Sequence, residues 1–393
     1  MAKIEYRKTA PEERLSVSRV QGAAFSFEVN EKETQEKIEK GEYKNDEIYA
    51  AMDESGKALA AIEALPYTMY FDTHKVSMYG IGGVASMPET RRQGHIRKIF
   101  EKIFSDIYEK GAVFSHLYPF SHDYYRKFGY EPCGSVKKYI LPVEAARRLS
   151  VGGDVREFVA GDTVRDKLIE VYESYALRHN VMLSRSPARW DEVLNINQYG
   201  IDKLYYWIDS GNIKSWAKFK RNGGMMDISD IAWEDRDSML GILGFMGMFE
   251  GTAEKFKFEA SPEFIAELYW NNLYDIQVEN CWIGMNRVVN AKRALELLKK
   301  PEGEGSFTIK VNDRFANWNN NTYTVEYGAG ECRVEAKGSD ADIELSECAF
   351  MQLALGVYEF EQVAKRADVQ AFGNIETLKK AFPKKPILIT DHF

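Results

Sequence analysis

The sequence contains few cysteines and histidines and no long apolar run. Its four cysteines stand at positions 133, 281, 332 and 348, without a CxxC pair or a histidine at metal-site spacing. No stretch approaches the ~18 apolar residues of a membrane span, and the first twenty residues lack the apolar segment of a signal peptide. These absences predict a cytoplasmic protein that binds no metal and no membrane.

Basic residues are not in excess either. The chain has 52 Lys and Arg against 60 Asp and Glu, which gives a net charge of −8. This balance disfavours nonspecific nucleic-acid binding and favours small cationic ligands. The chain does have length and apolar content, because 393 residues with 45 % hydrophobic content suffice for two or three domains with formed cores.

The most informative segment runs from residue 78 to residue 107. A predicted apolar strand at 78–84 is followed by a short turn and then by an amphipathic helix. Apolar residues at the 3.6-residue spacing of one buried face indicate this helix: Ile96, Ile99, Phe100, Ile103 and Ile107. The first turn of a helix leaves backbone N–H groups unpaired and carries partial positive charge, so it can hold a phosphate.

The turn before this helix contains Arg91, Arg92 and Gly94. Glycine lets the backbone come close to an anion, and the two arginines add positive charge around it. Arginines are common on surfaces, but at a helix start they oppose the helix dipole unless an anion is present. We therefore predict a pyrophosphate site here, in which the side chain of His95 faces solvent while its backbone N–H contacts phosphate.

The chain divides by composition into three segments, 1–145, 146–290 and 291–393, and the fold class predicted is α+β or mixed α/β. The first segment alternates strand and helix signals. Its strands are predicted at 47–52, 58–65, 67–70, 76–84 and 112–118, with a short helix at 123–127. The second segment has helices at 163–178 and 185–194 and strands near 205–233. The third has strands at 307–311, 322–327 and 332–336, with helices at 291–299, 346–355 and 360–365.

Two motifs carry a resemblance to known enzymes. The strand, turn and helix around Pro88, Arg91, Arg92 and Gly94 resemble the acetyl-CoA-binding signature of the GNAT superfamily of N-acetyltransferases. Ile96 stands where many members have Gly or Ala. Residues 124–130, YYRKFGY, resemble the Y-x-x-F-G-Y segment after the fifth strand of these enzymes. With a C-terminal segment similar to sterol carrier proteins and an aromatic last residue, the whole chain resembles the Eis (enhanced intracellular survival) subfamily.

This resemblance implies a domain order, a co-substrate and an assembly. An active GNAT domain would occupy residues 1–145, a degenerate GNAT-like domain 146–290, and a sterol-carrier-like domain 291–393. The protein would be a homo-hexamer that uses acetyl-CoA, without a metal, to acetylate primary amines of a small cationic acceptor such as an aminoglycoside or a polyamine. The residues expected to bind acetyl-CoA are Val84, Ala85, Ser86, Arg91, Arg92, Gln93, Gly94, His95 and Ile96.

Acetyl transfer to an amine needs a base and an acid, since the ammonium must lose a proton and the departing thiolate needs one. The resemblance implies Tyr125 as the general acid, although a packing tyrosine is the simpler alternative. It also implies the α-carboxylate of Phe393 as the base, against the alternative of a frayed chain end. His122 is a second candidate base. His116 is expected to be a core residue with satisfied hydrogen bonds.

The acceptor pocket is expected beside the first helix, where the resemblance places Phe25, Phe27 and Glu28. Aromatic and acidic side chains suit a polycation, although an ordinary amphipathic helix would carry the same residues. Arg185 and Arg189 are expected to serve structure rather than substrate binding. Two other functions stay open: a lipid- or acyl-CoA-binding protein that uses its sterol-carrier-like domain, and a protein-lysine acetyltransferase.

Overall fold

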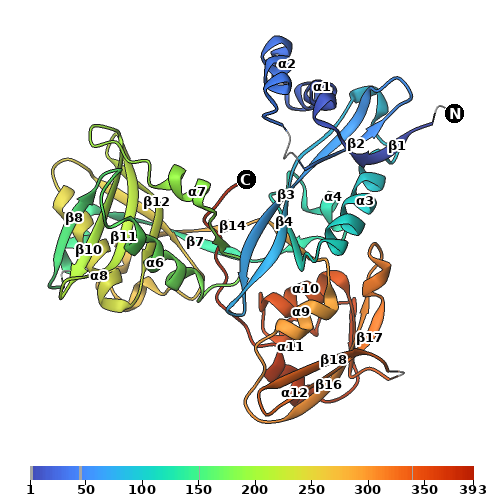
Figure 1. Cartoon of the computed structure of the whole chain (residues 1–393). Helices are drawn as coiled ribbons and strands as arrows, with labels where there is room; N and C mark the ends of the chain where they lie inside the picture. The colour runs from blue at the N-terminus through green and yellow to red at the C-terminus, as the bar shows by residue number, and fades with distance from the viewer. Residues whose placement is uncertain (1–2, 44–46, 150, 339) are drawn as a thin grey trace.

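Three mixed units make up the computed structural model, which describes residues 3–43, 47–149, 151–338 and 340–393. Within these residues the strands form sheets of eight, seven and five strands. In Figure 1 the second and third units lie on two sides of a long β-hairpin that belongs to the first unit. This arrangement confirms the mixed α/β class predicted from the sequence.

The first unit is built on a sheet in the order β1-β2-β3-β4-β5-β15-β6, and the short strand β9 also pairs with β3. Its elements are β1 (Glu5–Lys8), α1 (Arg14–Phe25), α2 (Glu31–Lys40), β2 (Ile48–Met52), β3 (Ala58–Phe71), β4 (His74–Ser86), α3 (His95–Glu109), β5 (Phe114–Leu117), α4 (His122–Arg126), β6 (Glu131–Pro132), β9 (Leu183–Ser184) and β15 (Met285–Val288). Neighbouring strands from β1 to β4 are antiparallel, whereas β4 and β5 are parallel.

Helix α3 packs against this sheet through the apolar face predicted from the sequence. Ile99, Phe100, Ile103 and Ile107 are fully buried, and Ile96 lies at the edge of the same cluster. The spacing of these apolar residues was enough to predict the helix, because they form the one face of α3 that strands β1 to β4 remove from water. The predicted helix is confirmed.

Strand β3 is longer than predicted. The sequence predicted two strands that end and begin around Pro66, but β3 runs through it without a break. β3 pairs with β2 as far as Glu63 and with β9 from Thr68, so no strand among the described residues pairs with this edge of β3 at Pro66. A proline is tolerated at such an edge because no ladder hydrogen bond is lost there.

The second unit is a sheet in the order β14-β7-β13-β12-β11-β10-β8, against which α6 and α8 pack. Its elements are β7 (Ser135–Pro142), α5 (Val143–Ala146), β8 (Asp154–Phe158), α6 (Arg165–Ala176), α7 (Pro187–Val193), β10 (Asp202–Asp209), β11 (Asn212–Asn222), β12 (Met225–Trp233), α8 (Arg236–Phe245), β13 (Lys255–Ala260) and β14 (Gln277–Trp282).

Sheet membership differs from the segment limits drawn at 145 and 290. Strand β7 lies before residue 145 but belongs to the second sheet, and β15 lies before residue 290 but is inserted between β5 and β6 of the first. Composition did not reveal this exchange, because a strand that joins a distant sheet has the same apolar pattern as one that joins its neighbour.

The third unit has the sheet order β18-β17-β16-β19-β20. Its elements are α9 (Ala291–Leu297), β16 (Gly305–Asn312), β17 (Asn321–Gly328), β18 (Glu331–Ala336), β19 (Ile343–Ser346), α10 (Glu347–Leu355), α11 (Phe360–Val363), β20 (Val369–Ala371) and α12 (Ile375–Ala381). Helix α10 contacts β15 and β6, so the third unit packs directly on the end of the first sheet.

The last residues of the chain are held between the units. We call residues 383–393 the tail. Ile387, Leu388 and Ile389 of the tail are buried in a core cluster that includes residues from all three units. The backbone of Asn180, after α6, exchanges hydrogen bonds with Pro386 and Leu388. None of the described helices combines the length and the apolar composition needed to cross a bilayer.

Candidate active site

The turn before α3 has the backbone geometry of an anion site. Arg92 and Gly94 both adopt left-handed conformations, with φ of 64° and 85°. Open space surrounds the Cα of Gly94, so the conformation rather than a close neighbour is what favours glycine there. Within the described part of the chain, no backbone hydrogen bond uses the N–H groups of residues 92–97. These donors converge at a helix start and are available to a phosphate.

A cavity of about 680 Å³, which we call the cradle cavity, opens at this turn. Eight of the nine residues predicted to bind acetyl-CoA line this cavity: Val84, Ala85, Ser86, Arg91, Arg92, Gly94, His95 and Ile96. The ninth, Gln93, donates its side-chain amide to the carbonyl of Glu89. The structure therefore places these eight residues around one cavity, and their role in binding acetyl-CoA stays a prediction.

His95 differs from the prediction. Its side chain is buried rather than facing solvent, with its Nδ1 3.1 Å from the hydroxyl of Tyr6. Burial lowers the pKa of His95, which favours the neutral ring. The partner comes from β1, almost ninety residues earlier, and so the sequence near the turn gave no indication of it.

The sheet opens beside the cradle cavity. Parallel pairing between β4 and β5 ends at Ile81 and Leu117, while β4 continues to Ser86. On its other edge β4 still pairs with β3, where Ala85 faces Ala61. Among the described strands, none pairs with the β5-facing edge of residues 82–86. The backbone groups along that edge can therefore bind an extended, amide-bearing ligand in place of a strand.

Tyr125 lies on α4 beside this opening. The residue is only 4 % exposed, and its ring contacts Phe120 and Tyr124, two residues that line the cradle cavity. Burial raises the pKa of Tyr125, and the nearby Tyr124 adds to this effect. The phenol therefore carries its proton at neutral pH, as a general acid must.

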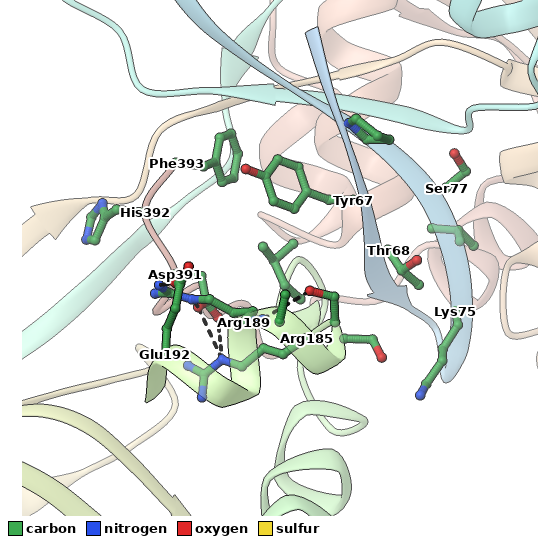
Figure 2. A pocket seen from close by; sticks show the side chains of 16 residues that line it. Tyr67, Thr68, Lys75, Ser77, Arg185, Arg189, Glu192, Asp391, His392 and Phe393 are labelled. Carbon is green, nitrogen blue, oxygen red and sulfur yellow. Dashed lines mark hydrogen bonds and ion pairs between the residues drawn. The ribbon is translucent and has the colours of Figure 1, made fainter. Parts of the chain in front are cut away.

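A second cavity, of about 810 Å³, lies along the other half of β4, and we call it the tail cavity. Its walls come from β3, β4, α7 and the last residues of the tail (Figure 2). The ring of Phe393 stacks on Tyr67, with 4.5 Å between the centroids. A Cβ on Gly80 would lie 2.3 Å from the Phe393 ring, so only glycine admits the tail at this point.

Asp391 fixes the end of the tail. This buried carboxylate accepts hydrogen bonds from Arg185 Nε at 3.0 Å and from Arg189 Nε at 3.1 Å, as Figure 2 shows. The backbone carbonyl of Asp391 also accepts from the hydroxyl of Tyr118 at 2.7 Å. Arg185 in turn forms an ion pair with Asp230 at 2.6 Å. The two arginines hold the tail in place, and both also line the tail cavity.

Sequence reasoning missed Asp391 as a residue of the site. The one available signal was a lone carboxylate two positions after the apolar run at 387–389. A buried carboxylate needs charged partners, and these are about two hundred residues away in the chain. Their identity could not be read from the tail itself.

The residues predicted to line the acceptor pocket do not lie together. Helix α1 ends at Phe25, where Ser26 adopts a left-handed conformation, so Phe27 and Glu28 lie beyond the helix. Phe25 lines the cradle cavity, whereas Phe27 and Glu28 line neither described cavity of the site. The structure therefore places Phe27 and Glu28 in the segment after the first helix, whereas the resemblance had placed them with the helix.

His116 and His122 lie in different surroundings, and the ring of His116 contacts that of Phe393, with 5.7 Å between the centroids. His116 is fully buried on β5, with Nδ1 4.0 Å from Cys133 Sγ and 3.4 Å from Asn286 Nδ2. Burial lowers the pKa of His116 to about 3, which keeps the ring neutral in the core. His122 lies at a separate small cavity with Asp123 and Trp282. Neither lines the cradle cavity or the tail cavity.

Two family models match the chain. Residues 5–133 match an acetyltransferase (GNAT) domain, and residues 291–389 match a sterol carrier protein domain. No curated protein matches the sequence. The first match shows that the chain carries the acetyltransferase domain of an enzyme, and the two matches together confirm the predicted domain types at the two ends.

Several solved structures share the fold over the whole length. A conserved protein of unknown function from Enterococcus faecalis V583 is 21 % identical, with a TM-score of 0.87 and 100 % of each chain covered. A GCN5-related N-acetyltransferase from Anabaena variabilis ATCC 29413 is 18 % identical, with a TM-score of 0.85 and the same coverage. Eis1 from Mycobacterium abscessus is 14 % identical, with a TM-score of 0.79, and again both chains are covered completely.

Proposed function

We propose that this chain transfers the acetyl group of acetyl-CoA to a primary amine by direct attack. The observation that carries the proposal is that two features of the backbone follow each other, one at the end of β4 and one at the start of α3. Free N–H groups of residues 92–97 lie at the start of α3, and the unpaired edge of residues 82–86 leads up to them. The first would bind the diphosphate and the second the pantetheine arm. Bound there, acetyl-CoA supplies an activated thioester.

The chain's own residues would perform the proton transfers. A backbone N–H within residues 84–86 would polarise the thioester carbonyl. Tyr125, kept protonated by burial, would protonate the departing sulfur. The α-carboxylate of Phe393 would take the proton of the amine, directly or through a water molecule, because the tail is docked rather than frayed. His122 is a weaker candidate base, since it lies at another cavity.

The acceptor would enter the tail cavity as a small cationic amine, such as an aminoglycoside or a polyamine. Cations in the wall of this cavity are already paired: Lys75 with Glu173, Arg185 with Asp230, and Arg189 with Asp391. The carboxylate of Phe393 would then supply negative charge for the acceptor. Hydroxyl groups also line the cavity, from Thr68, Ser77, Ser184 and Ser186, and would suit a polyhydroxylated amine.

We further propose that the chain assembles into a homo-hexamer. Strand β14 is an edge strand of the second sheet, and apolar residues on it and just before it are exposed: Leu273, Tyr274, Val278 and Trp282. An exposed apolar edge of this kind supports association between copies. Light scattering coupled to size exclusion would give the mass, and a monomer at micromolar concentration would refute this part of the proposal.

The decisive experiment is thiol release from acetyl-CoA with a panel of acceptors. Diamines, polyamines, aminoglycosides and lysine-containing peptides would be compared at matched concentration. We expect amine-dependent thiol release with the small cationic acceptors. Release with peptides alone would favour a protein-lysine acetyltransferase. No release with any acceptor, together with binding of a fatty acyl ligand, would favour a lipid- or acyl-CoA-binding protein.

A further inference from the structure

A third cavity, of about 610 Å³, lies where the three units meet, and we call it the junction cavity. Its walls come from the turn after β3, the end of α6, the segment after α9, the end of α12 and the beginning of the tail. None of its lining residues lines the cradle cavity or the tail cavity. The junction cavity is therefore a separate place in the molecule.

Positive charge predominates in the wall of the junction cavity. Five basic residues line it, against the two carboxylates of Asp72 and Glu302: Arg178, Lys299, Lys300, Lys380 and Lys385. This excess contrasts with the whole chain, whose net charge is −8. Clustered positive charge in a concave site attracts anions more strongly than the same charge spread over a surface.

Asp72 offsets only part of this charge. Its Oδ2 accepts a hydrogen bond from Lys385 Nζ at 2.5 Å and another from the backbone N–H of Lys299 at 2.8 Å. Both side chains of the ion pair are nearly buried, 11 % exposed for Lys385 and 5 % for Asp72. Burial lowers the pKa of Lys385, the ion pair with Asp72 opposes this effect, and the charges of Lys300 and Lys299 add to the lowering to a smaller extent. The lysines are thus close enough to repel one another.

Two of the lysines retain free ammonium groups. Lys299 and Lys380 are exposed, and in the described part of the chain no hydrogen bond or ion pair uses their Nζ atoms. Lys300, by contrast, donates to the carbonyls of Leu295 and Leu298. The wall of the cavity therefore combines the nearly buried ammonium of Lys385, which is paired with Asp72, and two exposed ammonium groups without a described partner.

We propose that the junction cavity binds a small phosphate-bearing anion. Lysine ammonium groups are point charges that serve phosphate well, and an anion here would relieve the repulsion among the lysines. The volume admits a ligand larger than inorganic phosphate, of the size of a diphosphate ester. The proposal is independent of acetyl transfer, because the cradle and the junction cavity share no residue.

Calorimetric titration with pyrophosphate tests the proposal. Pyrophosphate could also bind at the cradle cavity. The titration therefore uses the Arg91→Ala/Arg92→Ala variant throughout, in which two positive charges of the cradle cavity are removed. The backbone N–H groups of residues 92–97 remain in that background but lose the two arginine charges, so we expect the junction cavity to be the tighter site. The further changes Lys299→Ala/Lys380→Ala should raise the Kd of that tighter site at least tenfold. Both lysines are exposed, so the fold should be retained, which circular dichroism and the melting temperature would verify.

A matched control removes two neighbouring lysines that point elsewhere. Lys292 pairs with Glu296, and Lys379 pairs with Glu361 and Glu376, so neither belongs to the junction cavity. Lys292→Ala/Lys379→Ala should change the Kd less than twofold. Equal weakening by the two pairs of substitutions would overturn the proposal. The absence of any heat of binding in the Arg91→Ala/Arg92→Ala variant, before the lysines are changed, would also overturn it.

Discussion

At the scale of single residues, the protonation state of Tyr125 decides whether it can serve the reaction. The phenol is enclosed by Phe120, Tyr124 and Tyr130, and burial raises its pKa. The phenol therefore carries its proton at neutral pH. The same burial would also suit a packing tyrosine, so the role must be separated from the packing by experiment.

Tyr125→Phe removes the proton and keeps the ring. We expect kcat to fall by about a hundredfold, because a positioned general acid contributes on the order of 10²–10⁴. The dissociation constant of acetyl-CoA should change little. Steady-state kinetics and a direct binding measurement give the two quantities. Tyr124→Phe is the matched control, and a comparable loss of kcat in both variants would show that Tyr125 is not the acid.

Two buried histidines predict how stability depends on pH. Burial lowers the pKa of His116 to about 3 and that of His179 to about 4, from an ordinary value of 6.5. Below pH 6.5 the unfolded chain gains protons on these rings that the folded protein does not bind. Stability is therefore fully present above pH 6.5 and falls as the pH drops, by about 1.4 kcal/mol per pH unit for each histidine.

Urea unfolding between pH 7 and pH 4.5 measures this loss. His179→Gln should make the dependence on pH shallower, because one of the two rings no longer takes up a proton in the unfolded chain. His74→Gln serves as the control, since His74 is exposed. A stability that stays constant from pH 7 to pH 4.5 would contradict the prediction.

At the scale of elements, strand β4 joins the two halves of the site. Its C-terminal end borders the cradle cavity, its N-terminal half borders the tail cavity, and the ring of Phe393 packs over Gly80 between them. The end of the tail must therefore pack on β4 at Gly80 if the α-carboxylate of Phe393, the proposed base, is to reach an acceptor. This contact gives a test of the tail that leaves the last residue in place.

Gly80→Ala should dislodge the end of the tail. The new Cβ would meet the rings of Phe393 and Tyr67 at 2.3 Å and 2.8 Å, so the aromatic side chains must move. We expect the rate of acetyl transfer to fall at least tenfold while acetyl-CoA still binds. Gly152→Ala is the control, because no atom lies within 4 Å of the Cβ it would add and the residue lines neither cavity of the site. Equal activity in the two variants would remove the tail from the mechanism.

Elements with local signals were predictable from the sequence, and the contacts between distant elements were not. Helix α3 and the turn at Gly94 follow from apolar spacing and turn residues within twenty positions. The tail cavity instead combines β3 and β4 with α7 and residues 391–393, which no local pattern links. His95 shows the same limit at a single residue, since its partner Tyr6 belongs to another strand. The roles assigned to Tyr125 and Phe393 stay predictions.

At the scale of the whole molecule, one buried ion pair connects the first and third units. Arg287 on β15 and Asp313 after β16 are both fully buried, with 2.7 Å between Arg287 Nη2 and Asp313 Oδ1. Arg287 also donates to the carbonyl of Phe128 and lies over the ring of Phe104. Asp313 accepts further hydrogen bonds from the backbone of Phe315 and Ala316.

Arg287→Met should destabilise the protein by about 3–5 kcal/mol, since it leaves the charge of Asp313 buried without its partner. Urea unfolding followed by fluorescence measures the change. Arg293→Met is the control, because Arg293 is exposed and pairs only with Glu296. We expect one transition for the whole chain, since one core cluster includes residues of all three units. A separate transition for any one unit would contradict this expectation.

The insertion of β15 between β5 and β6 also has a consequence during synthesis. About 150 residues separate β6 from β15 in the chain. A ribosome that adds roughly 5–20 residues per second needs on the order of ten to thirty seconds to make them. During this interval the nascent first sheet has an open edge at β5. Aggregation or a chaperone can compete for that edge until translation delivers the missing strand.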